Sequence, residues 1–175
     1  MNDAALSAFE RLVELMCEDK NELLISYQRT SWTVDVTIQA SPTDVKRLVG
    51  AGGITFKSLC CVLRSITHTG HDTYSLSPVV ASSNGSAKDF KRFRPCLDWP
   101  RDKVASLVLD LAAAAFPWSS PECTEDELSN SSVFEINLST PSKRAAATFG
   151  EALDRVLRVV GIRIGRMLNA KVVTR

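Results

Sequence analysis

The sequence predicts an α+β protein built from two similar halves. Stretches with apolar residues at three- and four-residue steps, typical of helices, occur together with stretches in which apolar and polar residues alternate, typical of strands. The chain also shows an approximate repeat, because Gly150 lies 100 positions after Gly50 and Ile136 stands at the same offset from Val36. With 175 residues, the chain is long enough for one domain or two small ones.

The first half is predicted to fold as helix, strand, strand, short helix, glycine loop, helix and strand. The first helix has apolar residues on one face, and the second strand alternates valine and isoleucine with polar residues. The short helix begins at SPTD, where Ser41 can cap and Pro42 fits the first turn. The expected elements are a helix at about 4–17, strands at 22–28 and 32–40, a helix from Pro42 to about Val49, a helix from about Ile54, and a strand at 71–80.

The second half repeats this order less regularly. The acidic stretch SSPECTEDELSNSS, residues 119–132, stands where the first half has its opening strand, so we expect that strand to be lost or degraded. The expected elements are a helix at about 101–116, a strand at 131–140, a helix starting at Thr140 that leads into a long helix at about 151–168, and a terminal strand in KVVTR.

Between the halves, the Ser/Gly/Asn cluster ASSNGS predicts a linker. We therefore expect a first domain at 1–80, a basic linker at 81–99 and a second, degenerate domain at 100–175.

Composition restricts the function classes. Hydrophobic residues make up 45% and charged residues 23% of the chain, as in ordinary globular proteins. No apolar stretch reaches the roughly 20 residues of a membrane span, and the beginning MNDAALSAFERL shows no secretory pattern. The five cysteines form an odd set without CxxC spacing, which suits reduced thiols. We expect a cytoplasmic protein with no membrane partner.

The sequence contains no recognisable catalytic or metal-binding constellation. His68 and His71 are the only histidines, and a metal site usually needs three or four ligands. Nucleophile-elbow, kinase and zincin motifs are missing. We expect no enzyme activity, no cofactor and no metal. Trp32, Trp99 and Trp118 are expected to be core or junction anchors.

Three glycines fall within residues 50–53, inside VGAGGITFKSL. Glycine costs a helix about 0.5–1 kcal/mol relative to alanine, so the local backbone has some special requirement. A dinucleotide fingerprint would follow a strand, and the P-loop pattern GxxxxGK[ST] is missing. The remaining interpretation is a helix-loop-helix whose exposed N–H groups, with the N-terminus of the second helix, receive phosphate.

Residues 49–59 resemble the signature of the K-homology (KH) domain, in which an apolar-Gly-x-x-Gly run precedes apolar and basic residues at helical spacing. The predicted element order of the first half resembles the type II KH fold, α-β-β-α-α-β, of small bacterial KH-domain RNA-binding proteins. The second half would then be a degenerate KH-like α+β half. The resemblance implies a non-catalytic protein whose loop clamps about four nucleotides of single-stranded RNA, with the bases in an adjacent apolar groove.

The residues expected to contact RNA are the loop and its basic and apolar neighbours: Lys46, Arg47, Val49, Gly50, Ala51, Gly52, Gly53, Ile54 and Lys57. The strand near Tyr74 would add to the groove wall. The family commonly has a basic residue at one of the two variable loop positions, which are Ala51 and Gly52 here, so weaker binding is expected. In the second half, Glu151 after Gly150 would place a carboxylate where phosphate would sit.

Two basic stretches are candidates for additional RNA contacts. In KDFKRFR, Lys91, Arg92 and Arg94 alternate with phenylalanines that either stack on bases or tuck into the domain junction. The long helix of the second half has arginines on one face, which is either a solvated face or a second electrostatic contact. These arginines are Arg155, Arg158, Arg163 and Arg166.

A second function class stays open on the sequence alone. The chain could be a KH-fold scaffold or protein-interaction module with little or no RNA affinity. It would then hold a protein partner or a ribonucleoprotein through an apolar patch or through the acidic residues 122–127, which are expected to form a loop.

Overall fold

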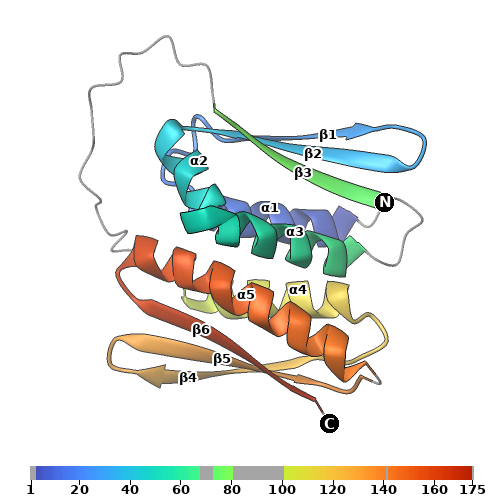
Figure 1. Ribbon diagram of the computed structural model, residues 1–175. Coiled ribbons are helices and arrows are strands. Elements are labelled where there is room, and N and C mark those ends of the chain that lie inside the picture. Colours follow the sequence, from blue (N-terminus) through green and yellow to red (C-terminus); the bar gives the residue numbers. More distant parts are fainter. Residues whose placement is uncertain (1–2, 68–72, 81–100, 141, 175) are drawn as a thin grey trace.

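The computed structural model describes residues 3–67, 73–80, 101–140 and 142–174 (Figure 1). These residues form four layers: a three-stranded sheet, the helices of the first half, the helices of the second half, and another three-stranded sheet (Figure 1). The predicted α+β class is confirmed.

The first half has the predicted element order, with boundaries within two residues of those expected. Strand β2 lies in the middle of its sheet, antiparallel to β1 and parallel to β3, with Val36 opposite Tyr27 and Leu76. The elements are α1 (Asp3–Met16), β1 (Leu24–Arg29), β2 (Thr33–Ala40), α2 (Pro42–Val49), the 3-10 turn η1 (Ala51–Gly53), α3 (Ile54–Thr67) and β3 (Thr73–Val80).

The second half forms a sheet with the same pairing. Strand β5 lies in the middle, antiparallel to β4 and parallel to β6. The elements are α4 (Arg101–Ala115), β4 (Glu122–Leu128), β5 (Ser131–Leu138), α5 (Lys143–Ile164) and β6 (Met167–Thr174).

The expectation that the second half had lost its opening strand is wrong. Residues 122–128 form β4, with seven residues in register with β5. The acidic side chains are compatible with a strand because β4 is at the edge of the sheet, where charge prevents pairing with other chains. Cys123, opposite Ile136, is half-buried and packs against the core. Residues 122–127 are therefore not a loop.

The long helix of the second half also differs from the prediction. One uninterrupted helix runs from Lys143 to Ile164 and passes through Gly150. It ends at Gly165, whose left-handed conformation (φ 71°) lets the N–H of Arg166 bond the carbonyl of Gly161 at 3.0 Å. Arg166 therefore lies beyond the helix, outside the predicted arginine face.

The two halves share one hydrophobic core. Helix α3 packs against α5 and α4, and α1 packs against α4 (Figure 1). The fully buried side chains include Phe9 and Leu59 from the first half and Phe149 from the second. The Arg163 guanidinium crosses between the halves and donates to the carbonyl of Leu15 at 2.6 Å, near the negative end of α1.

Trp32 and Trp118 do not anchor the core as expected. Trp32 is 72% exposed and Trp118 is 56% exposed, with Trp118 making an edge-on contact to the buried ring of Phe116. Both lie in connections between elements, Trp32 before β2 and Trp118 before β4. Trp99 is outside the described residues, as are His68, His71 and the predicted linker 81–99 with Lys91, Arg92 and Arg94.

Within the described residues, no single helix is both long and apolar enough to cross a membrane. Taken together, α2 and residues 51–67 have the length and composition of a membrane span, but the two parts are bent by 45° relative to each other.

Replacing Gly150 with alanine is expected to destabilise the protein, although alanine is the better helix former. A Cβ on Gly150 would lie 2.7 Å from Cγ2 of Val172, so α5 and β6 would have to separate. We expect a loss of about 1–3 kcal/mol in the free energy of unfolding, measured by urea denaturation. The second change Val172→Ala should recover part of this loss, and strictly additive effects of the two changes would contradict the close contact.

Candidate nucleic-acid interface

Residues 50–53 form a bend between α2 and α3 and do not continue the helix. Gly50, Gly52 and Gly53 all have positive φ values, of 70°, 60° and 74°. Residues with a Cβ rarely adopt these angles, which accounts for three glycines in four positions. The bend, which sequence reasoning placed between Val49 and Ile54, is confirmed.

The tip of this bend is open to solvent. Ala51 and Gly52 are exposed, and a Cβ on Gly52 would have no atom within 4 Å. The N–H of Gly50 donates to the carbonyl of Lys46 at 2.8 Å, and that of Gly53 donates to Gly50 at 3.2 Å. Among the turn, loop and cap hydrogen bonds of the described part of the chain, none uses the N–H of Ala51 or Gly52. These two amides can donate to an approaching anion.

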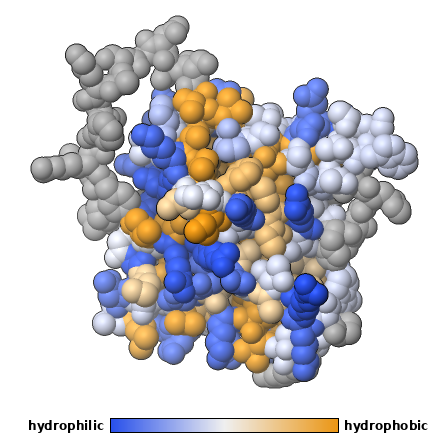
Figure 2. Space-filling view, in the orientation of Figure 1, coloured by the Kyte–Doolittle hydropathy of each residue, from blue (hydrophilic) through white to orange (hydrophobic). Residues whose placement is uncertain are grey.

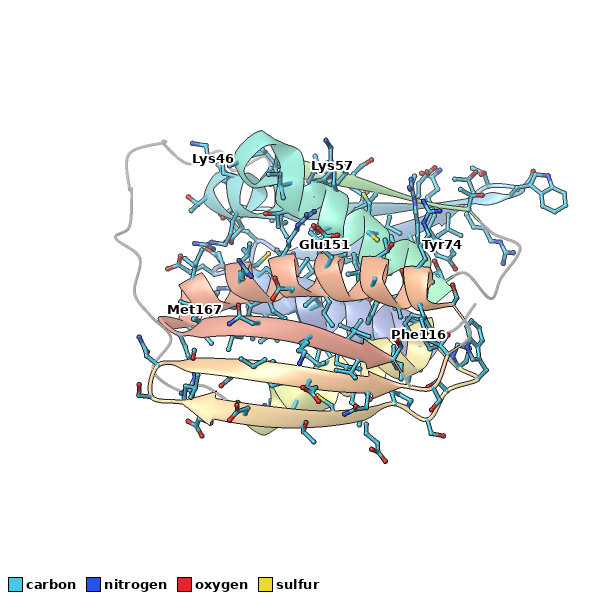
Figure 3. All side chains as sticks on the ribbon, turned by 60° about the horizontal axis from the view of Figure 1, so that its bottom comes forward. Lys46, Lys57, Tyr74, Phe116, Glu151 and Met167 are labelled. Atoms are coloured by element: carbon cyan, nitrogen blue, oxygen red, sulfur yellow. The ribbon has the colours of Figure 1, made fainter. Side chains whose placement is uncertain are left out.

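Two lysines flank the bend. Lys46 is on the last turn of α2 and Lys57 is in the first turn of α3, and both are exposed on the same side of the molecule (Figure 3). Among the described residues, neither lysine takes part in an ion pair. The neighbourhood of the loop therefore carries positive charge that is not neutralised within the fold.

Arg47 is placed differently from the prediction. Its side chain is only 15% exposed and its guanidinium bonds Asp44 at 2.6 Å, with Glu18 at 3.5 Å. It also donates to the carbonyl of Met16 at 3.3 Å. Arg47 therefore ties α2 to the end of α1 through contacts within the fold.

Apolar side chains lie beside the loop and at the end of β3. Ile54 is 53% exposed, Val79 44% and Val80 48%. Figure 2 shows hydrophobic surface gathered near the end of β3 and α2, bordered by hydrophilic residues. Tyr74, expected in a groove wall, is instead buried in the core opposite Val34.

The start of α2 is held by Asp44, which is 1% exposed. Its carboxylate accepts hydrogen bonds from the backbone N–H groups of Glu18 at 2.9 Å and Asp19 at 3.1 Å, and from the Ser41 hydroxyl at 3.0 Å. The Arg47 guanidinium completes the set. The spacing of Ser41 and Asp44 signals a helix cap, but the partners at 18 and 19 are distant in sequence and were not foreseen.

The second half has no counterpart of the loop. Helix α5 has 22 residues, which equals the 8 residues of α2 plus the 14 residues of α3. Gly150 is buried in α5 against β6, and Glu151 pairs with Arg155 one turn later. The expected division into a helix up to Gly150 and a second helix from residue 151 is therefore wrong, because α5 continues through Gly150.

The predicted arginine face is occupied by contacts within the protein. Arg155 and Arg158 stay 48% and 62% exposed in their ion pairs, so a contact of these two side chains with RNA stays a prediction. Arg155 pairs with Glu151, Arg158 with Asp154 at 2.9 Å, Arg163 with the carbonyls of Glu14 and Leu15, and Arg166 with Glu127 at 2.8 Å.

Two of the cysteine thiols, those of Cys17 and Cys123, have raised pKa values. Burial raises the pKa of Cys17 to about 12, and the neighbouring Asp44 charge adds to the rise. Burial likewise raises the pKa of Cys123 to about 11. Both thiols stay protonated at neutral pH. Within the described residues, no three His, Cys, Asp or Glu side chains gather as metal ligands.

A comparison with models of known protein families gives no match, and a comparison with curated proteins gives no relative.

Replacing Asp44 with alanine is expected to lower the free energy of unfolding by about 3–5 kcal/mol. The change leaves the Arg47 charge and two backbone N–H groups without their acceptor in a largely buried place. Thermal and urea denaturation measure the loss. Asp126→Ala, at an exposed position of β4, is the matched control and should stay within about 0.5 kcal/mol of the parent. Equal stability of the two variants would contradict the assigned role of Asp44.

Proposed function

We propose that this protein binds single-stranded RNA through the backbone of residues 50–53, without catalysing a reaction. The observation that carries the proposal is the exposed glycine bend, in which the N–H groups of Ala51 and Gly52 are not used by the fold. The first turn of α3 follows directly, so its partial positive charge adds to the attraction for phosphate.

The topology supports a type II KH arrangement for residues 3–80. Its element order is α-β-β-α-α-β, and the sheet is mixed, with β2 between an antiparallel and a parallel neighbour. The glycine bend lies between the two consecutive helices, as the resemblance of residues 49–59 implies. In this interpretation the second half is a derived copy that has kept the sheet and replaced the helix-loop-helix with α5.

Each part of the interface has a chemical counterpart in a single strand. The two free amides suit one phosphate, Lys46 and Lys57 suit its neighbours, and Ile54 with the exposed end of β3 suits the apolar faces of bases. Phosphate contacts of this kind position the strand without reading its sequence.

The interface carries little charge, so binding should be modest and weakly salt-dependent. Two lysines that neutralise phosphates correspond to a slope of about −1.4 in log affinity against log salt, at roughly 0.7 per contact for single strands.

The charge of the loop tip should control affinity. Ala51 has no positive φ, so other side chains fit there without strain. Ala51→Lys should tighten binding of a short single-stranded RNA pool and steepen the salt slope by about 0.7. Ala51→Asp should abolish binding, because a carboxylate at the tip repels phosphate.

Fluorescence anisotropy at two salt concentrations measures both effects, with single-stranded DNA as a second probe. Ser129→Asp adds the same charge at an exposed turn of the second half and should leave binding unchanged. If neither nucleic acid binds, or if Ala51→Asp binds as well as the parent, RNA binding by this loop is excluded. A protein complex insensitive to salt and to Ala51 would favour the scaffold function.

The lysines should contribute through charge alone. Lys46→Ala and Lys57→Ala should each weaken binding uniformly across RNA sequences and reduce the salt slope by about 0.7. Lys171→Ala, at an exposed position of β6, removes the same charge together with an ion pair to Glu135 at 3.4 Å, and serves as the control. Equal effects of all three changes would show that only the net charge matters.

A further inference from the structure

Thr55 lies directly against Gly50, the residue at which the chain leaves α2. A Cβ on Gly50 would be 2.2 Å from Oγ1 and 2.8 Å from Cβ of Thr55. Thr55 is the first buried residue of α3 and is 7% exposed. Its side chain therefore fills the space that any side chain at position 50 would need.

The loop has almost no packing of its own. Residues 50–53 contribute a single methyl group, that of Ala51. Glycines have access to more backbone conformations than other residues, so three of them in a row of four need an external restraint to keep one conformation. The hydrogen bonds of Gly50 and Gly53 close the turn, but they fix neither the N–H of Ala51 nor that of Gly52.

We propose that Thr55 is a positioning residue that holds the loop in the conformation presenting the N–H groups of Ala51 and Gly52. A β-branched residue in a helix has few side-chain rotamers, so Thr55 acts as a stiff wedge beneath Gly50. The consequence for binding rests on the proposed RNA function, whereas the consequence for loop rigidity does not.

Two substitutions at position 55 distinguish the role of the side chain's shape from that of its hydroxyl group. Valine has nearly the shape of threonine and keeps the wedge, while alanine removes it. Thr55→Val should therefore bind RNA like the parent protein. Thr55→Ala should bind about two- to tenfold more weakly, because the loop must be ordered on binding. Its salt slope should be unchanged, since no phosphate contact is lost.

Thr67 provides a matched control on the same helix. It is 8% exposed at the other end of α3, and its hydroxyl donates to the carbonyl of Leu63 at 2.7 Å. Thr67→Ala makes the same chemical change in a comparably buried place, away from the loop. It should leave RNA affinity unchanged, with thermal melts confirming that each variant is folded.

Backbone ¹⁵N relaxation of the full chain without RNA tests loop rigidity directly. In Thr55→Ala, the order parameters of residues 51 and 52 should fall toward the flexible range, below about 0.6, and they should stay at parent values in Thr55→Val and Thr67→Ala. Should Thr55→Ala not fold, Thr55→Ser tests the stiffness of the wedge instead. It keeps Oγ1 and Cβ beside Gly50 but removes the methyl group that restricts the rotamer, so the order parameters of residues 51 and 52 should fall below parent values.

The outcomes distinguish this inference from the proposed function. If the parent protein binds no RNA, the proposed function fails, and the relaxation data still decide whether Thr55 holds the loop. Unchanged order parameters in Thr55→Ala would overturn the positioning role, as would equal losses of affinity in Thr55→Ala and Thr67→Ala. A reduced salt slope in Thr55→Ala would instead make Thr55 part of a direct contact.

Discussion

The placement of the loop depends on the buried carboxylate of Asp44. Helix α2 has only eight residues, and a helix of that length is unstable on its own in water, so tertiary contacts must hold it. Asp44 supplies them by accepting hydrogen bonds from the segment after α1, while Arg47 extends the connection to Glu18. These contacts fix the helix in the body of the protein and leave its C-terminal end, where the glycines begin, at the surface.

A comparison of the two halves shows that the sheet does not require this loop. Both halves have a three-stranded mixed sheet with the same pairing, but the second covers its sheet with the single continuous helix α5. The four extra residues of the first half include three glycines, whose positive φ angles a residue with a Cβ would rarely adopt. The same sheet therefore forms without such a bend, which agrees with the role in binding proposed for it.

The sequence predicted most of the first half because local signals there agree. Helical spacing, strand alternation, the Ser41 cap and the glycines each mark an element. In the second half, β4 was missed because acidic composition obscured a strand whose position at the sheet edge is a tertiary property. The partners of Arg47 could not be foreseen, since Glu18 lies far away in sequence. The contact of Thr55 with Gly50 was missed for another reason: five residues of separation across a bend give no pattern to detect.

Two kinds of basic residue occur near the loop: arginines that bond other groups of the protein, and lysines whose charge is not paired within the described residues. Arg47 and Arg163 bridge carboxylates or carbonyls between elements, a task for which the planar guanidinium with five donors is suited. The two cations left beside the loop, Lys46 and Lys57, are lysines, whose compact, hydrated charge on a flexible stem fits a phosphate without fixing its orientation. With amides at the tip and lysines at its sides, this interface would attract a strand through its backbone. Any preference among bases must then come from the apolar side chains of Ile54 and the end of β3.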